Sequence, residues 1–333
     1  MAAHPWPVFG HDWAVEHLRR AIAHGRVRHA YLIVGPQSVG KAALARAFAQ
    51  ALNCELADED ARPCGECRAC KRIASGNHPD LLEAELDPTT GALRIEEVRS
   101  VTGRIAFKPY EARYRIAIFR DFDRARPQAQ DALLKTLEEP PPQAVLILLA
   151  PAADALLPTI VSRSQVINLR PVPAATVRAA LIAHRGADPA QADLIARLCG
   201  GRMGWALQAL ADPAPLAQRA QALDLLEQAL SLDRAGRFAL ADDLSKDKQA
   251  LGPLLELWQT FWRDVLLLCE GAPLPPANAD RLSTLEALAR ELSPEAALTA
   301  LQATRAAFAN LSYNLNLRLA LEVMFLDYPD LRR

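Results

Sequence analysis

The chain has 333 residues, which predicts at least two domains because a domain averages about 150 residues. Hydrophobic residues make up 51% and charged residues 23%, a composition typical of folded proteins and outside the disordered range. The 38 Lys and Arg residues nearly balance the 39 Asp and Glu residues, and this net charge of −1 argues against a protein that coats nucleic acid through bulk positive charge. No apolar run approaches the roughly 20 residues of a membrane helix, and residues 1–13 do not resemble a signal peptide, so we expect a cytoplasmic protein without membrane contacts.

Short apolar runs alternate with helical stretches in the first half of the chain. The runs that we expect to form strands are residues 31–34, 80–84, 114–119, 144–149 and 165–169. Because strands separated by helices are joined by crossover connections, the pattern predicts an α/β domain with a five-stranded parallel sheet and helices on both faces.

Beyond Pro173 the strand pattern disappears, and Ala and Leu recur at helical spacing. The later helices are expected at 216–230, 238–247, 251–270, 277–292 and 294–328. Their apolar side chains are expected to form the core of a helical bundle, and they include Trp258, Phe261, Trp262, Leu266 and those within 311–325.

Turn residues suggest where the parts of the chain meet. Gly200-Gly201 and Asp212-Pro213 interrupt the helical pattern. We therefore expect a sheet domain (1–170), a small helical unit (171–212) and a helical bundle (213–333).

The first chemical motif is Gly35-Pro-Gln-Ser-Val-Gly40-Lys41-Ala42, which lies between the strand at 31–34 and a predicted helix at 42–52. In this setting glycines let backbone N–H groups converge on a phosphate, the helix N-terminus adds its dipole, and Lys41 supplies a cation. The motif predicts a phosphate loop with Gly35, Gly40 and Lys41 as the binding residues. The alternative is a glycine turn that only begins a helix.

Two positions that should support Mg²⁺ are altered. Ala42 replaces the Ser or Thr hydroxyl of the loop, and the strand 114–119 ends in Arg120-Asp121, where a hydrolytic enzyme needs Asp or Asp-Glu. An Arg repels the ion that a carboxylate would bind, and Asp123 follows on the loop. We therefore expect no Mg²⁺ and no ATP hydrolysis by this chain; ATP binding is doubtful, and the sequence leaves it open.

Four cysteines cluster as Cys54-x9-Cys64-x2-Cys67-x2-Cys70, a module that spans residues 54–70. Four thiolates complete the tetrahedral shell of one Zn²⁺ and leave no open position, so the spacing predicts a structural zinc site. Disulfides are the alternative, which a reducing compartment disfavours.

Other residues near the module carry no clear signal. The basic residues within or beside it would contact DNA or a partner, or would simply be solvated, and the second alternative is favoured; they are Arg62, Arg68, Lys71 and Arg72. The two remaining cysteines, Cys199 and Cys269, lie in apolar helical segments and are expected to be buried.

Arg163 is expected on a short polar loop just past a helix, between the strands at 144–149 and 165–169. Such a residue is well placed to reach outward. On its own it is more often a surface Arg than one that enters a neighbouring active site.

Two motifs carry a family resemblance. The stretch Asp131-Ala-Leu-Leu-Lys-Thr-Leu-Glu-Glu-Pro-Pro-Pro-Gln143, and the later Leu157-Pro-Thr-Ile-Val-Ser-Arg163-Ser164, closely resemble the AAA+ subunits of the bacterial DNA polymerase III clamp loader. The cysteine module after the helix at 42–52 is similar to theirs. The motifs cover residues 1 to about 210, whereas the bundle is similar in position and helical character only.

Within that family the pattern of losses resembles the delta-prime subunits rather than the tau/gamma ATPase. Ala42 and Arg120-Asp121 replace the Mg²⁺ elements of tau/gamma, Pro151-Ala152 replaces its polar sensor, and Gly204 stands where its second-sensor Arg would be. The resemblance implies an AAA+ domain, a helical lid and a helical collar. It also implies that the chain has no ATPase of its own.

The resemblance implies that Arg163 is an arginine finger, which stabilises charge on the γ-phosphate in the ATP site of a neighbouring subunit. The implied partners are delta and three tau/gamma copies in a pentamer that places the ring-shaped sliding clamp on primed DNA, as part of the DNA polymerase holoenzyme. Two alternatives stay open: an active P-loop ATPase of the tau/gamma kind, and a stand-alone zinc-containing DNA-binding protein.

Overall fold

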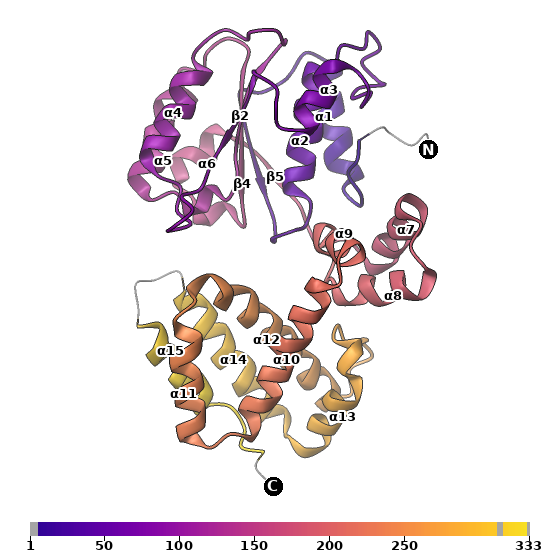
Figure 1. The fold of residues 1–333 in the computed structure, drawn as a ribbon, viewed down its shortest axis with the longest axis vertical. Coiled ribbons are helices and arrows are strands. Elements are labelled where there is room, and N and C mark those ends of the chain that lie inside the picture. The colour runs from indigo at the N-terminus through magenta and orange to yellow at the C-terminus, as the bar shows by residue number, and fades with distance from the viewer. Residues whose placement is uncertain (1–5, 312–315, 332–333) are drawn as a thin grey trace. The chain divides into compact units, whose positions relative to one another are not determined.

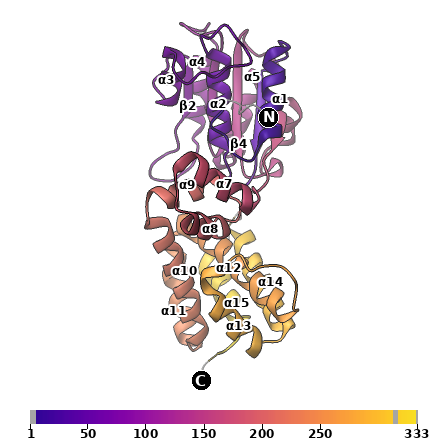
Figure 2. The same cartoon turned by 90° about the vertical axis from the view of Figure 1, so that its right-hand side faces the viewer.

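The computed structural model describes residues 6–311 and 316–331. Its contacts divide the chain into two compact units, one made of Met1–Ala180 with Gly201–Trp205 and the other of Leu181–Gly200 with Ala206–Arg333. Figures 1 and 2 show that the first unit contains the sheet, while the second consists of helices. The expected three-part division of the chain stays a prediction.

The sheet of the first unit has five strands, all parallel, in the order β2-β3-β4-β1-β5. The strands are β1 (Ala30–Val34), β2 (Leu81–Ala84), β3 (Arg115–Phe119), β4 (Ala144–Ala150) and β5 (Gln165–Asn168). Each lies within a residue or so of the run predicted for it, so the predicted α/β class with a five-stranded parallel sheet is confirmed.

Successive residues of the central strands face opposite layers because side chains alternate along a strand. On β1, Tyr31 and Ile33 belong to one buried cluster, while Leu32 and Val34 belong to the other. All residues of β1 and β4 are buried, as expected for a parallel sheet covered on both faces.

The helices α1 to α3 cover one face of the sheet and α4 to α6 the other (Figure 1). They are α1 (Asp12–Ala23), α2 (Lys41–Asn53), α3 (Arg68–Ala74), α4 (Ile95–Ile105), α5 (Pro127–Glu138) and α6 (Pro158–Arg163), with one-turn 3₁₀ segments η1 (Phe122–Arg124) and η2 (Ala153–Ala155). The predicted helix at 42–52 is α2.

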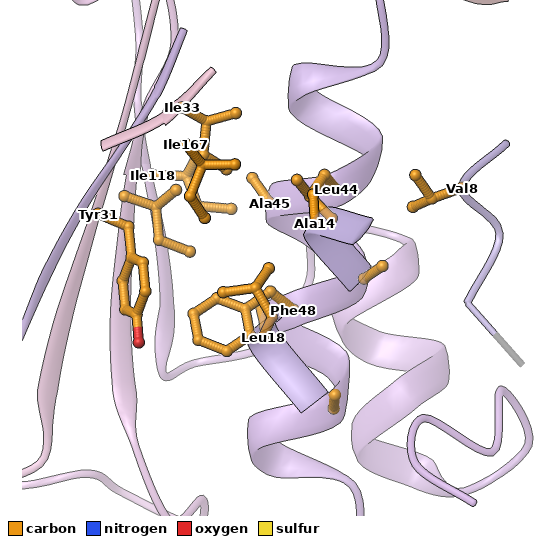
Figure 3. Close-up of a cluster of buried hydrophobic side chains, with 14 of the residues drawn as sticks. Val8, Ala14, Leu18, Tyr31, Ile33, Leu44, Ala45, Phe48, Ile118 and Ile167 are labelled. Atoms are coloured by element: carbon orange, nitrogen blue, oxygen red, sulfur yellow. The ribbon is translucent and has the colours of Figure 1, made fainter. Parts of the chain in front are cut away.

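Helix α2 anchors the loop that precedes it because its apolar face is buried against the sheet. Figure 3 shows Leu44, Ala45 and Phe48 pointing toward the strand residues Tyr31 and Ile33. The rings of Phe48 and Tyr31 meet edge to face, with centroids 4.9 Å apart. The N-terminus of α2 is therefore fixed next to the end of β1.

The second unit has its own core of apolar side chains, which include Trp258, Phe261 and Trp262, all fully buried. Leu266 is half-buried beside it. The helices of this part are α7 (Ala174–Arg185), α8 (Pro189–Leu198), α9 (Met203–Ala211), α10 (Ala214–Ser231), α11 (Arg234–Ser245), α12 (Lys248–Cys269), α13 (Leu282–Glu291), α14 (Pro294–Asn310) and α15 (Leu317–Leu326), with the 3₁₀ segment η3 (Ala279–Arg281). Helices α7 and α9 each contribute residues to both units.

The prediction of a single helix at 294–328 is wrong. Helix α14 ends at Asn310, and α15 begins after Asn316, whose side chain accepts a hydrogen bond from the N–H of Leu319 at 3.3 Å. An Asn in this position satisfies an N–H group that the first turn of a helix leaves unpaired. Residues 312–315 of the predicted helix lie outside the described residues.

The apolar residues of 311–325 are only partly in the core: Leu321, Met324 and Phe325 are buried, whereas Leu319 and Val323 are exposed. Within residues 6–311 and 316–331, no helix is long and apolar enough to cross a membrane.

Candidate functional site

The predicted phosphate loop lies between the end of β1 and the start of α2. The N–H of Gly35 donates to the carbonyls of Ala150 and Pro151 at the end of β4, at 3.2 and 3.1 Å. Gly35 has φ +150°, and a Cβ there would meet the carbonyl oxygen of Leu169 at 2.4 Å, so only glycine fits. The loop is thus tied to the neighbouring strand end.

Lys41 is directed at its own loop. Its Nζ donates to the carbonyl oxygens of Gly35 and Pro36, at 2.5 and 2.9 Å. Burial lowers the pKa of Lys41, although the nearby Asp121 and Asp123 act in the opposite direction. The ammonium that would bind a phosphate therefore already has oxygen partners within the protein.

The first turn of α9 contacts the phosphate loop directly. The N–H of Gly204 donates to the carbonyl of Ser38 at 2.7 Å. A Cβ at Gly204 would lie 2.9 Å from that same oxygen. Gly204 stands at the expected second-sensor position, where the arginine is missing. Because it has no side chain, it also lets the backbone of α9 approach the phosphate loop.

Neither Ala42 nor Arg120 offers a ligand to a cation. Ala42 has no side-chain oxygen. The guanidinium of Arg120 pairs with the Oε2 of Glu83 on β2 at 2.8 Å, and Arg46 from α2 binds the other oxygen of the same carboxylate at 2.7 Å. A cation of the protein itself thus stands at the position where a hydrolytic P-loop enzyme binds its metal with a carboxylate.

One acidic group is left beside the loop without a full set of partners. The Oδ1 of Asp123 is buried and has no hydrogen-bond partner. Burial raises the pKa of Asp123, and the neighbouring Asp121 raises it further, whereas Arg124 and Lys41 lower it. Asp121 itself has the left-handed φ of +46° at the start of η1.

Arg163 is the last residue of α6, and its side chain is 37% exposed. Its Nη2 donates to the Oε1 of Glu138 at 2.8 Å, and its Nη1 donates to the carbonyl of Thr159 at 3.1 Å. The polar loop expected here is wrong, because residues 158–163 form the short helix α6 and Arg163 lies at its exposed end.

The four cysteines predicted to bind one metal are brought together. All four Sγ atoms lie within 4.8 Å of one another. A tetrahedral Zn²⁺ with bonds of about 2.3 Å to sulfur needs sulfurs about 3.8 Å apart, so the arrangement can hold a metal ion after small adjustments. Cys67 also caps α3, because its Sγ accepts a hydrogen bond from the N–H of Cys70 at 3.4 Å.

The electrostatics of the thiols agree with a cation site. The N–H of Cys67 points at the sulfur of Cys64 and is the main reason that the pKa of Cys64 is lowered to about 7. Burial raises the pKa of Cys54 and of Cys70. Buried thiols become thiolates when a metal compensates their charge, so this donor set fits Zn²⁺.

The basic residues near the module mostly have partners inside the chain. Arg62 is buried and donates to the carbonyls of Leu56 and Ala57. Arg68 and Arg72 both pair with Glu111. Lys71 is exposed. The contacts of Arg62 favour a structural role in ordering the loop between Cys54 and Cys64.

The two remaining cysteines were expected to be buried. Cys199 is buried, as predicted, at the end of α8. Cys269 is only half-buried at the end of α12, so the expectation is met in part.

The sequence analysis missed Glu83 and Glu138, which shape these sites. It named Gly204 but missed the contact of this residue with the phosphate loop. Glu83 carried a signal, since a charged residue inside the otherwise apolar strand Leu-Leu-Glu-Ala requires a partner. Glu138 carried none beyond its place in the motif, because its contact with Arg163 joins residues 25 positions apart.

Comparisons with known proteins agree with the motifs. A family model described as "DNA polymerase III, delta subunit" matches residues 10–173, and one described as "DNA polymerase III, delta subunit, C terminal" matches residues 213–329. DNA polymerase III subunit delta′ of Pseudomonas aeruginosa is 34% identical over 236 residues, which cover 70% of this chain and 66% of that protein.

Other similar proteins include the larger subunits and a solved structure. DNA polymerase III subunit tau of Bacillus subtilis is 36% identical over 158 residues, 47% of this chain but only 27% of tau. A solved DNA polymerase III gamma subunit-related protein from Thermotoga maritima is 19% identical, with a TM-score of 0.46 over 94% of this chain and 97% of its own. On the two family matches and the delta′ and tau relatives, the chain belongs to the clamp-loader family of DNA polymerase III that contains the delta′, tau and gamma subunits.

Proposed function

We propose that this chain is a delta′-type clamp-loader subunit, which does not hydrolyse ATP itself but lends Arg163 to the ATP site of a neighbouring subunit. The observation that carries the proposal is a contrast within one unit. The exposed Arg163 is retained, while Ala42 and the paired Arg120 occupy the positions that Mg²⁺ would need.

The charges beside the phosphate loop support the absence of hydrolysis. Mg²⁺-dependent phosphoryl transfer needs oxygen ligands that hold the metal against the β- and γ-phosphates. Here Glu83 is shared by Arg120 and Arg46, and Lys41 donates to loop carbonyls. Silent nucleotide binding would require Lys41 to leave these carbonyls.

The chemistry proposed for Arg163 is electrostatic. A guanidinium from one subunit stabilises the negative charge that spreads over the γ-phosphate oxygens of its neighbour during hydrolysis. It forms no covalent bond and transfers no proton, since an arginine stays charged. This chain would thus complete an active site that it does not itself contain.

We further propose that the chain assembles with delta and tau/gamma subunits, and that the assembly places the sliding clamp on primed DNA in the cytoplasm. The lid (171–212) and the collar (213–333) would supply the interfaces. A structural Zn²⁺ on Cys54, Cys64, Cys67 and Cys70 would hold the module together. With a net charge of −1, the chain itself is not a general DNA-coating protein, so we assign DNA contact to the assembly.

The test is Arg163→Ala in the complex reconstituted with delta and tau/gamma, with ATP turnover measured in the presence of clamp and primed DNA. Turnover at the neighbouring site should fall by up to ~10³-fold, which is the lower end of the range for arginine fingers. Assembly, measured by size-exclusion chromatography, should be unchanged. Arg163→Lys is the control, because it keeps the charge and loses the planar fork. Unchanged turnover at every site would rule the role out.

The isolated chain separates the two alternatives. ATP hydrolysis that Lys41→Ala abolishes would identify an active ATPase. Binding of primed DNA without partners, weakened by Cys67→Ala, would identify a stand-alone DNA-binding protein. Neither is expected.

A further inference from the structure

Helix α6, which carries Arg163, is short and is held by polar contacts from α5. At its start, the N–H of Leu157 donates to the Oε1 of Gln130 at 2.9 Å. Gln130 is only 4% exposed, and its Nε2 donates to the carbonyl of Ala125 at 3.0 Å. Ile160 in the middle of α6 is fully buried. These contacts hold the backbone of α6 independently of Arg163, its last residue.

The second polar contact acts on the side chain of Arg163 itself. Glu138, the last residue of α5, accepts a hydrogen bond from Nη2, while the carbonyl of Thr159 accepts one from Nη1. A guanidinium has five N–H donors, so these two bonds leave three for other oxygens. The guanidinium is thus held at both terminal nitrogens and still has donors for a phosphate.

We propose that Glu138 is a positioning residue for Arg163: its carboxylate fixes the guanidinium in the orientation that the neighbouring ATP site needs. This inference rests on the proposed function of Arg163. Glu138 acts through Arg163 and does not contact the nucleotide.

Exposure of the pair determines what it can contribute. Glu138 is 52% exposed and Arg163 37%, and ion pairs this exposed add little to folding stability. An arginine side chain has many rotamers, however, and holding it in one of them beforehand removes an entropic cost from the reaction step. Loss of Glu138 should therefore affect turnover and leave folding unchanged.

A rival role for the same contact is a latch that restrains Arg163 until a neighbour binds. The two roles predict opposite signs. Without a positioning residue turnover falls, whereas without a latch turnover rises or the KM for ATP falls. The contact of Nη1 with Thr159 favours positioning, because the two bonds together define an orientation.

The experiment compares Glu138→Ala and Glu138→Gln in the reconstituted complex with delta and tau/gamma. The measured quantity is the part of ATP turnover that Arg163→Ala removes. Glu138→Ala should lower its kcat about three- to tenfold, with the KM for ATP unchanged; tenfold corresponds to about 1.4 kcal/mol. Glu138→Gln keeps an oxygen acceptor and should retain kcat within about twofold. Thermal stability and assembly should match the wild type.

Glu139→Ala is the matched control. It removes the same charge one residue further along, and Glu139 has no ion pair in the part of the chain that the structure describes, so it should not change kcat. In an Arg163→Ala background, Glu138→Ala should have no further effect, because a positioning residue acts only through the group it positions.

The outcomes separate the positioning role of Glu138 from the proposed role of Arg163. A Glu138→Ala complex with wild-type or faster turnover overturns the positioning role, while leaving the role of Arg163 intact if Arg163→Ala is slow. A further loss in the double variant overturns it too, since Glu138 would then act elsewhere. Unchanged turnover in Arg163→Ala itself removes both the proposed function and this inference.

Discussion

The phosphate loop and the end of α6 each hold one cation that nucleotide hydrolysis could use, but the two side chains have different partners and different exposure. Lys41 donates to the carbonyls of Gly35 and Pro36 in its own loop. Arg163 is part-exposed and keeps donors free of the two bonds that hold it. Lys41 therefore has its oxygen partners within the loop, whereas Arg163 lies at an exposed helix end with donors left for other oxygens.

Substitution of the two cations should have opposite effects on turnover and stability. Arg163→Ala should cost the complex up to ~10³-fold in turnover at one site and leave the melting temperature unchanged. Lys41→Met should do the reverse, because two carbonyls lose their charged donor; we expect a loss of about 1–3 kcal/mol in stability and wild-type turnover. Parallel ATPase assays and thermal melts check both.

A single result would contradict the contrast. If Lys41→Met lowered turnover of the complex as much as Arg163→Ala does, without a lower melting temperature, the loop would be an active site.

The fold was predictable because its main signals are local. The central strands β1 and β4 are short apolar runs, and their apolar residues on both faces mark a buried parallel sheet. The break between α14 and α15 was missed because the surrounding residues have one continuous helical pattern, and the new start of α15 is marked only by the N-cap Asn316. A cap replaces only one or two hydrogen bonds, so it leaves little trace in periodicity.

The site was predictable where spacing alone determines it. Cys64, Cys67 and Cys70 are separated by two residues each, a spacing typical of zinc-binding turns, and this local pattern with Cys54 nearby predicted the cluster. The pairing of Arg120 with Glu83 and that of Arg163 with Glu138 join different elements, and only the packing of those elements brings the charges within 2.8 Å. No local pattern reports such distances.

The cysteine module is a third region, and there the expected effects are on metal content and stability. We expect one Zn²⁺ per chain in protein purified without added metal. A chelator should then lower stability by about 4 kcal/mol, if the metal is present at about a thousand times its Kd. Metal analysis and thermal melts test this, and Cys67→Ser should lose the metal whereas Cys269→Ser should keep it. A zinc content near zero with oxidised cysteine pairs would show disulfides instead.

The contact between α9 and the loop can be tested with two glycines. Gly204→Ala places a Cβ 2.9 Å from the carbonyl of Ser38 and should destabilise the chain by about 1–3 kcal/mol. Gly103→Ala in α4 is the control, since its Cβ meets nothing within 4 Å, and alanine there should stabilise by up to about 1 kcal/mol. Denaturant titrations measure both. Equal shifts for the two variants would mean that the close approach at Gly204 has no energetic weight.

The smallest expected effect concerns Asp123, the acidic group beside the loop that has no partner for its Oδ1. Burial raises the pKa of Asp123 in the folded state, so the carboxyl favours folding while it is protonated, and this contribution is lost as the pH rises from the unfolded pKa through the folded one. At neutral pH the ionised group therefore opposes folding. Asp123→Asn keeps the shape without the charge, and it should stabilise the chain by about 1 kcal/mol or less at neutral pH, with a smaller gain near pH 4. Denaturant titrations at the two pH values check the sign. A variant less stable than wild type at neutral pH would show that the attraction between Asp123 and Lys41 outweighs the cost of burying the carboxylate.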